Sequence, residues 1–480
     1  MELLQGIWSV AQWVWPIVYF AFSIFAIGYV IYSEREDSTK AIAWVFAVAL
    51  IPVLGFIAYL LLGHEWRGSK MYQKHITDRS PVSRGQSRVE PDVDPMADLT
   101  MQQQHLLNLV TASQPLPASY DNKVQLYFNG EHKYAQLKKD IAAAQNHIHL
   151  EYFIWQRDEL GDELKDMLFE KLKEGVEVRV MTDATGSLTS KTKYLQQLRD
   201  QGLPMYFFHP GRKNLSHINH RCHRKNAIID GKIGYIGGFN VGDEYVNKGP
   251  LGFWRDTHAR FEGTAAQDLQ SVFLSDWYFA TGEDITDDKY FPPSDRPGDV
   301  AVQICPSGID VARPSILYTY FYLITSATKT VRIWTPYFIP RPGLITAIEK
   351  ASLSGVDVKI ITPGKFDHPP VQWAGRTFMP QLMEMGVEFY EYQDGFVHAK
   401  VVASDDAAAA VGTANFDHRG FKMDFEMTSA IVGGGIATQL NEQFEKDLEH
   451  CRKVELGDFE NWPFIKSAKY AVSRLASPMY

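Results

Sequence analysis

The sequence has few cysteines and no excess of positive charge. Its 480 residues include three cysteines, Cys222, Cys305 and Cys451, which lie far apart and form no C-x-x-C pair. A zinc site or a dense disulfide framework needs more cysteines at closer spacing, so we interpret all three as reduced thiols facing the cytoplasm. The formal net charge is −9, whereas proteins that mainly bind nucleic acid are usually strongly basic. The composition therefore argues against a nucleic-acid partner.

Charged residues are also missing from two long runs near the amino terminus. The first run extends from Trp8 to Tyr32, and the second, after the polar connection SEREDSTK, from Ala41 to Leu62. Each run has the length of about 20 residues that a helix needs to cross a bilayer. The pattern predicts a two-helix transmembrane hairpin over residues 1–64, with both ends on one side of the membrane. A buried hairpin in a soluble core is the alternative, but the aromatic residues toward the ends of the runs favour the membrane.

A basic segment follows the predicted hairpin. Residues 65–97 are polar, have no apolar period and contain several prolines, which is typical of a linker between a membrane part and a soluble part. Lysine and arginine are enriched on the cytoplasmic side of membrane helices, so we expect a multi-pass protein whose soluble part faces the cytoplasm. The basic residues are Arg67, Lys70, Lys74, Arg79, Arg84 and Arg88.

The remaining sequence predicts an α/β fold that occurs twice. Helix-like and strand-like periods alternate, which is the pattern of an α/β domain. The order helix, strand, helix, strand of the first half returns in the second half, with the same Gly-Val turn at Gly175 and at Gly355. We predict two tandem α/β domains related by pseudo-two-fold symmetry, residues 98–295 and 296–480.

The two halves also share a spaced set of polar residues. The segments HRKNAIID and HAKVVASD have the same H-x-K-x-x-x-x-D spacing. In each half an asparagine lies 17 residues beyond the motif histidine, and a carboxylate follows further on. The repeated positions are His223, Lys225, Asp230, Asn240 and Asp256 in the first half, and His398, Lys400, Asp405, Asn415 and Glu426 in the second.

These residue types suit chemistry on a phosphate. Alternate side chains of a strand share one face, so the histidine and the lysine of each motif point to the same side. Two imidazoles can serve as nucleophile and as general acid and base, while lysine and asparagine donors bind phosphoryl oxygens. A single H-x-K is most often a solvated surface pair, and the second copy is what favours function. A double displacement needs groups on both sides of phosphorus, so we expect the two motifs to meet in one cleft.

HRKNAIID with GGFN, and HAKVVASD with GTAN, look like the paired HKD motifs of the phospholipase D superfamily. With the amino-terminal hairpin and the segments NHRCHRK, TPYFIP, GFVHAK and GTANFDHRGF, the chain resembles the bacterial cardiolipin synthases over nearly its whole length. The resemblance implies two phospholipase D-like domains and a phosphatidyltransferase of the bacterial plasma membrane. Such an enzyme converts two phosphatidylglycerols into cardiolipin and glycerol through a phosphatidyl-histidine intermediate, without a required metal or other cofactor.

The resemblance also implies roles for the repeated residues. His223 is expected to be the nucleophile and His398 the general acid and base, although the sequence leaves their order open. The phosphate ligands would be Lys225, Lys400, Asn240 and Asn415. The carboxylates that orient the two rings would be Asp256 and Glu426. The motif aspartates, which in the family support the local structure more than they touch substrate, are Asp230 and Asp405.

Several alternatives stay open. If water resolved the intermediate, the protein would be a hydrolase such as a phospholipase D or a nuclease. A non-catalytic lipid-binding scaffold is another alternative, but a scaffold would not need two imidazoles. The second lipid and the oligomeric state, a homo-oligomer included, are undetermined. His217, His220 and His223 are three residues apart, but the segment is loop-like and lacks a fourth ligand, so we predict no metal site. The carboxyl-terminal run NWPFIKSAKYAVSRLASPMY is either an interfacial helix on anionic lipid or an amphipathic helix packed on its domain.

One departure from the repeat concerns the residues near the asparagines. Gly238 in the first half corresponds to Thr413 in the second. The difference predicts that the two half-sites bind phosphate unequally.

Overall fold

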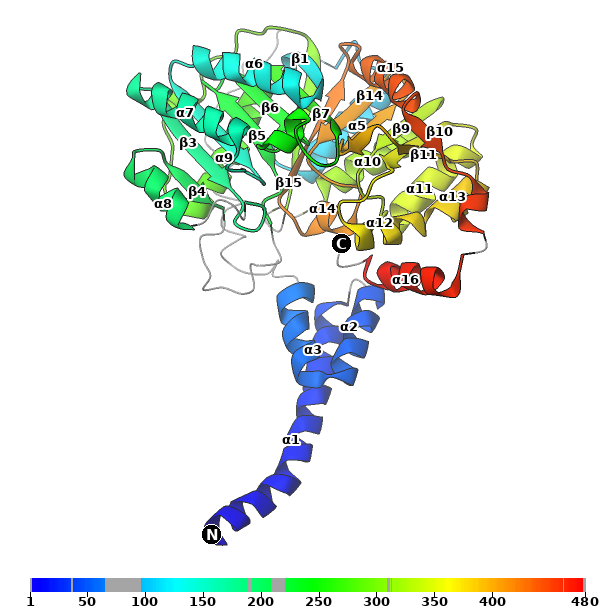
Figure 1. Ribbon diagram of the computed structural model, residues 1–480. Coiled ribbons are helices and arrows are strands. Elements are labelled where there is room, and N and C mark those ends of the chain that lie inside the picture. Colours follow the sequence, from blue (N-terminus) through cyan, green and yellow to red (C-terminus); the bar gives the residue numbers. More distant parts are fainter. Residues whose placement is uncertain are drawn as a thin grey trace. The chain divides into compact units, whose positions relative to one another are not determined.

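The computed structural model describes residues 2–35, 38–64, 96–187, 192–208, 221–308, 311, 313–460 and 462–477. These residues form an amino-terminal unit, which ends at residue 64, and a large unit, which begins at residue 96 (Figure 1). The basic residues 67–88 and the histidines 217 and 220 lie outside the described residues. All three cysteines are free thiols, as the sequence predicts.

The amino-terminal unit contains one long apolar helix, α1 (Glu2–Ser33). Its segment Trp13–Ser33 has a mean hydropathy of 2.0, and among the described residues it is the one helix long and apolar enough to cross a membrane. Two shorter helices follow, α2 (Ser38–Leu50) and α3 (Pro52–Ala58), and a π-helical turn (Tyr59–Gly63) ends the unit. The first predicted span is therefore a helix.

The second apolar run is not the single span that the sequence predicts. Its helix stops at Leu50, and Pro52, which has no amide hydrogen to extend α2, begins α3. The chain then doubles back, so that α2 and α3 lie side by side (Figure 1) and a Cβ at Gly55 would lie 2.5 Å from the Ala47 oxygen. The 13 residues of α2 extend over about 20 Å, which is less than the bilayer core of about 30 Å. The predicted pair of spanning helices is thus corrected to one long helix and a short helical hairpin.

The large unit is built on a 16-stranded sheet in its described residues. The path of hydrogen-bonded strands is β16-β11-β10-β9-β13-β14-β15-β8-β1-β7-β6-β5-β2-β3-β4, and β12 pairs with β7. The strands of the first half are β1 (Ser119–Asn129), β2 (His147–Tyr152), β3 (Glu177–Thr182), β4 (Met205–Phe207), β5 (Lys225–Ile229), β6 (Ile233–Gly237) and β7 (Phe253–Glu262). Those of the second half are β8 (Val300–Ser307), β9 (Thr330–Trp334), β10 (Asp357–Pro363), β11 (Glu388–Tyr392), β12 (Gly395–Val397), β13 (Val401–Ser404), β14 (Ala408–Gly412), β15 (Glu426–Val432) and β16 (Cys451–Lys453).

Helices cover both faces of this sheet. Helices α9 and α15 share one apolar core with strands of both halves. On the other face, α6, α7 and α8 cover the first half, while α5, α10, α11 and α13 cover the second. The helices are α5 (Met101–Ser113), α6 (Gly130–Ala143), α7 (Glu159–Lys173), α8 (Thr192–Asp200), α9 (Thr264–Thr281), α10 (Ser315–Ser326), α11 (Pro342–Leu353), α12 (Pro369–Arg376), α13 (Met379–Glu384), α14 (His418–Lys422), α15 (Ile436–Leu448) and α16 (Phe464–Leu475).

The internal duplication that the sequence predicts is present. In the first half β2, β3 and β4 are parallel, β5 pairs antiparallel with β2, and β6 pairs antiparallel with β5. In the second half β9, β10 and β11 are parallel, and β13 and β14 take the places of β5 and β6. The first strands of the two halves, β1 and β8, pair with each other and join the halves into one unit. The fold is thus a pair of similar α/β domains with a continuous sheet.

Candidate active site

The backbone of each half crosses to the other half just before the motif histidine. Strand β12 lies parallel to β7, and the amide of His398 donates to the Arg255 oxygen at 2.7 Å. At the equivalent place Cys222 forms an isolated bridge with Phe425, and the amide of His223 donates to the Phe425 oxygen at 2.9 Å. These pairings bring each motif histidine next to a carboxylate from the opposite half.

Each imidazole is bound by that carboxylate. The Nδ1 atom of His223 lies 2.7 Å from Oε1 of Glu426, and Nδ1 of His398 lies 2.7 Å from Oδ2 of Asp256. A carboxylate at Nδ1 holds the ring proton there and leaves a lone pair on Nε2. The side chains of His223 and His398 are only 13% and 9% exposed, so both rings are largely buried. The geometry gives two oriented imidazoles, each dependent on both halves.

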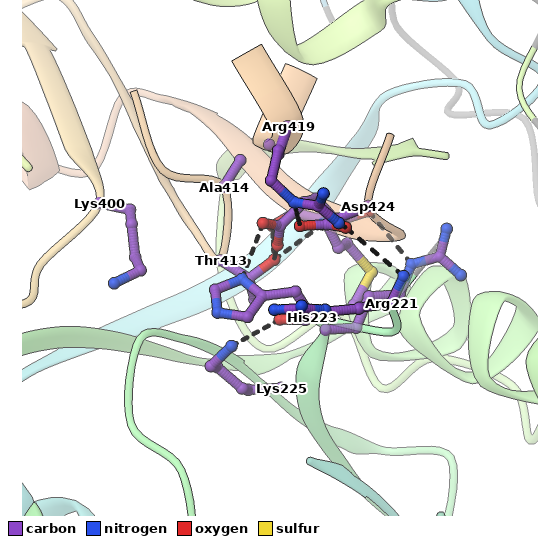
Figure 2. A network of polar contacts seen from close by, with 12 residues as sticks. Arg221, His223, Lys225, Lys400, Thr413, Ala414, Arg419 and Asp424 are labelled. Carbon is purple, nitrogen blue, oxygen red and sulfur yellow. Dashed lines mark hydrogen bonds and ion pairs between the residues drawn. The ribbon is translucent and has the colours of Figure 1, made fainter. Parts of the chain in front are cut away.

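The two motif lysines lie beside these rings. Figure 2 shows Lys225 beside His223, with Lys400 on a separate segment of the chain. The ammonium of Lys225 donates to the His223 oxygen at 2.6 Å, and that of Lys400 donates to the His398 oxygen at 2.5 Å. Burial lowers the pKa of Lys225 to about 8 and that of Lys400 to about 7. A bound anion would offset the cost of burying these charges, so the pair suits a phosphate.

Both rings are held in the neutral form. Burial, followed by the charge of Lys400, lowers the pKa of His398 to about 4. Burial and then Lys225 lower the pKa of His223 well below its ordinary value. Burial raises the pKa of the Glu426 carboxyl well above its usual range. Neutral imidazoles with free Nε2 lone pairs can act as nucleophile or as base.

The two carboxylates have different neighbours. The hydroxyl of Thr413 donates to Oε2 of Glu426 at 2.5 Å. In the first half Gly238 occupies the equivalent position, and a Cβ there would lie 2.0 Å from Oδ1 of Asp256. The shorter carboxylate therefore needs the space that glycine leaves, and its other polar contacts are to the Thr257 amide at 2.7 Å and the Trp254 indole at 3.5 Å. The two half-sites share a plan but differ in how the acid is held.

The predicted phosphate-binding asparagines are not equivalent. Asn240 is buried, accepts from the Ile154 amide at 3.1 Å and donates to the Tyr245 hydroxyl at 3.1 Å. Asn415 is only partly buried, and its Oδ1 has no hydrogen-bond partner among the described residues. The side chain of Asn240 is thus the more firmly held of the two.

The motif aspartates lie away from the rings. Lys225 is the first residue of β5, and Asp230 directly follows the last. The carboxylate of Asp230 accepts from the amides of residues 145, 146 and 147 at 2.7–2.9 Å. Asp405 accepts in the same way from the amides of residues 328, 329 and 330 at 2.8–3.0 Å. Both have a positive φ, 55° and 50°. These carboxylates cap the start of β2 and β9 at the far end of the motif strand, a place that suits support of the local structure and not a catalytic role.

Two buried arginines that the motif comparison did not single out bind the main-chain carbonyl oxygens of the two acids. Arg224 donates to the Glu426 oxygen at 3.1 Å and is ion-paired with Asp276. Arg255 donates to the Asp256 oxygen at 2.5 Å and is ion-paired with Asp447 at 2.8 Å. The alternation of side chains in HRK places Arg224 on the opposite face of the strand from His223 and Lys225. An arginine on such a face usually reaches solvent, so the sequence did not indicate that Arg224 is buried.

The three-histidine set weighed as a metal site is not testable from the described residues, because two of its members lie outside them. Within the part of the chain that the structure describes, no group of three or more metal-ligating side chains occurs.

Two sequence families match the chain. The family described as "Cardiolipin synthase, PLD-like domain" matches residues 137–277 and 320–448, one segment in each half. The family described as "Phospholipase_D-nuclease N-terminal" matches residues 16–64. The matches cover both motif-bearing halves and the amino-terminal unit.

Individual proteins agree with these matches. The chain is 38% identical to the major cardiolipin synthase ClsA of Bacillus subtilis over 473 residues, which cover 96% of this chain and 98% of that protein. It is 37% identical to the cardiolipin synthase of Alkalihalophilus pseudofirmus over 468 residues, which cover 96% and 93%. Among solved structures, phosphatidylserine synthase from Haemophilus influenzae has a TM-score of 0.61 at 15% identity, over 79% of this chain and 100% of that chain. That likeness supports the fold of the large unit.

Proposed function

Because the chain belongs to the cardiolipin synthase family, we propose that it transfers a phosphatidyl group from one phosphatidylglycerol to another, with cardiolipin and glycerol as products. The observation that carries the proposal is the pair of crossed imidazole–carboxylate contacts, each 2.7 Å long, beside two buried lysines. One imidazole can attack phosphorus while the other serves the leaving group. A site built for a single imidazole would not need this arrangement.

In the first step, Nε2 of one histidine attacks the phosphorus of phosphatidylglycerol. A nitrogen–phosphorus bond forms and the bond from phosphorus to the glycerol oxygen breaks. The second histidine gives its proton to that oxygen, and glycerol leaves. The negative phosphate raises the pKa of the nearby imidazole, which supplies the protonated form that this step needs.

In the second step, a hydroxyl of another phosphatidylglycerol attacks the phosphatidyl-histidine. The second histidine now accepts the hydroxyl proton, an oxygen–phosphorus bond forms and the nitrogen–phosphorus bond breaks. The first imidazole returns to its neutral form and cardiolipin is released. Lys225 and Lys400 neutralise the phosphoryl oxygens in both steps, Asn415 orients them through its amide hydrogens, and Asn240 fixes the loop beside them.

We assign the nucleophile to His223 and the acid and base to His398. Asp256 raises the pKa of His398 by its charge and its hydrogen bond, which favours the protonated ring of a general acid. Glu426 has a raised pKa and also accepts a hydrogen bond from Thr413. Both features make Glu426 a weaker counter-charge for a protonated His223 ring. A ring that stays neutral suits a nucleophile.

For membrane placement, we propose that α1 crosses the bacterial plasma membrane and that the large unit faces the cytoplasm. The basic residues between 67 and 88 support this side. Because α2 and α3 double back on each other, α1 is the crossing helix among the described residues, and the amino terminus would lie outside. Labelling of a cysteine placed at residue 5 by an impermeant maleimide in intact cells tests this topology.

The test of function uses the full chain in vesicles with labelled phosphatidylglycerol. We expect cardiolipin and glycerol in equal amounts. A rival hydrolase of the same fold would release phosphatidic acid as the sole lipid product, and that result would contradict the transferase. Adding unlabelled phosphatidylethanolamine to the same assay tests whether a different second lipid is accepted.

A further inference from the structure

The last helix of the chain, α16 (Phe464–Leu475), shows its apolar side to solvent. At 100° per residue, its large apolar side chains fall on one face of the helix. They are among the most exposed apolar side chains of the described large unit: Phe464 85%, Ile465 81%, Leu475 77% and Val472 65%. An apolar stripe of this kind is normally the side that a helix buries.

The opposite face of α16 is the one that packs on the protein. Tyr470 and Ser473 are 6% and 7% exposed. The Tyr470 ring lies 4.3 Å from the ring of Trp462 and 6.2 Å from that of Trp373 on α12. The orientation of the helix is therefore set by these contacts, with the apolar stripe outward. This geometry contradicts the simpler alternative, in which an amphipathic helix packs its apolar face on its own domain.

Cationic side chains lie beside the apolar stripe. Lys469 stands 3.3 Å from the centre of the Trp373 ring, Lys466 stands 4.4 Å from that of Trp462, and α16 contains no acidic residue. Arg474 donates to the Thr377 oxygen at 3.1 Å. A helix with an apolar face and a cationic, acid-free polar face has the composition of helices that lie in the interface of anionic bilayers.

The helix is on the same edge of the sheet as the candidate active site. It packs against α12, which follows the carboxyl end of β10. Lys400 directly precedes β13, whose first residue pairs with Trp334, the last residue of the neighbouring parallel strand β9. Both features thus lie beyond the carboxyl ends of the parallel strands.

We propose that α16 is an interfacial helix, whose apolar face inserts among the acyl chains of a bilayer that contains anionic phospholipids. Three observations favour a bilayer over a second copy of the chain or the amino-terminal unit as the occupant: the acid-free cationic flank, a helix in the same chain that is long and apolar enough to cross a membrane, and the shared edge with the site. The helix holds the large unit against the surface that carries its proposed lipid substrate.

The first experiment measures insertion directly and does not depend on catalysis. The full chain, with Cys451→Ser to remove the one partly exposed thiol, is labelled with an environment-sensitive fluorophore at Ile465→Cys and reconstituted in vesicles of phosphatidylcholine and phosphatidylserine. We expect a blue-shifted emission that lipids with a quencher on the acyl chain suppress at least about twofold.

Leu353→Cys is the matched control. Leu353 is 69% exposed and ends α11, before the start of β10, whereas α16 lies beyond the other end of that strand. Its label should stay unquenched. Equal quenching at both positions, no quenching at Ile465, or protection of Ile465 that persists in detergent at high protein concentration would each overturn the proposal, the last in favour of a second copy.

The second experiment rests on the proposed function. In the double variant Ile465→Asp and Val472→Asp, we expect the KM for phosphatidylglycerol in vesicles to rise about tenfold while kcat at saturation is unchanged. Activity toward a short-chain, monomeric phosphatidylglycerol should be that of the wild type. Leu353→Asp should change neither value. An unchanged KM in the double variant would overturn the docking role even if the enzyme is fully active.

Discussion

The half-site of His223 and the half-site of His398 have the same frame and different chemistry at the acid. In both, the backbone just before the histidine pairs with the other half, and a carboxylate of that half lies 2.7 Å from Nδ1. At His223 the acid is a glutamate that also accepts from Thr413. At His398 it is an aspartate that fits because position 238 is a glycine.

The difference shows how the two copies of a duplicated site can take different catalytic roles. The residues that we propose to face the phosphate are of the same types in both halves, an imidazole and an ammonium in each. The positions behind them have diverged, so that one ring is better supported as a cation than the other. The imidazoles alone look interchangeable, and the assignment of roles comes from the groups that hold them.

The largest expected effect separates the two histidines. His223→Ala and His398→Ala should each lower turnover of phosphatidylglycerol by about 10³-fold or more. With a phosphodiester whose leaving group needs no protonation, such as a nitrophenol ester, His398→Ala should still form the covalent adduct, because only the acid is missing. Intact-protein mass spectrometry would detect it. An adduct in His223→Ala and none in His398→Ala would reverse the assignment.

The second-largest expected effect is a difference in kcat between substitutions of the two acids, Asp256 and Glu426. Asp256→Asn should lower kcat by about 10³-fold, since the charged ring of the acid loses its counter-charge, and Glu426→Gln by about 10-fold to 10²-fold. Both substitutions keep the shape of the side chain, so thermal unfolding serves as the control for folding. Equal losses in kcat would remove the basis for unequal half-sites.

A smaller effect is expected from substitutions of Gly238 and Thr413, which lie against the two acids. Gly238→Ala places a methyl group against Asp256 and should lower kcat by about 10²-fold, because the carboxylate must move. Thr413→Ala removes one hydrogen bond to Glu426 and should lower kcat by only a few-fold. The reciprocal result, a greater loss from Thr413→Ala, would contradict the account of how each acid is held.

The smallest effect is a shift in pH dependence. The lysines must be protonated to bind phosphate, so kcat/KM should fall as pH rises through the pKa of Lys400, about 7, and further through that of Lys225, about 8. Lys400→Arg keeps its charge at these pH values, so its activity, although lower, should begin to fall only near pH 8. Lys225→Arg is the matched control, and its fall should still begin near pH 7.

The sequence predicts which residues form the candidate site better than it predicts which of those residues contact one another. His223, Lys225 and their counterparts repeat at one spacing, and a repeat is visible without any knowledge of contacts. That Glu426 serves His223 and Asp256 serves His398 depends on pairing between segments far apart in the sequence, 203 residues from His223 to Glu426 and 142 residues from Asp256 to His398. Pairing over such distances is a property of the folded chain, not of a local pattern.

Two other differences have local causes. Counting uncharged residues predicted a second spanning helix, but Pro52 divides that run and Gly55 lets its two parts pack closely. Arg224 resembled a solvated side chain because its position faces away from the site, and the structure buries it at 1% exposure against Asp276. In both cases tertiary contacts decide what the local pattern leaves open.

The crossed contacts also bear on the time during which the chain is made. Glu426 leaves the ribosome 203 residues after His223, which at roughly 5–20 residues per second takes about 10 to 40 s. Throughout that interval the nascent protein, with its amino-terminal helices already synthesised, has an imidazole without its acceptor. A half-made chain therefore cannot begin to consume the lipids around it, and activity starts only when translation is nearly complete.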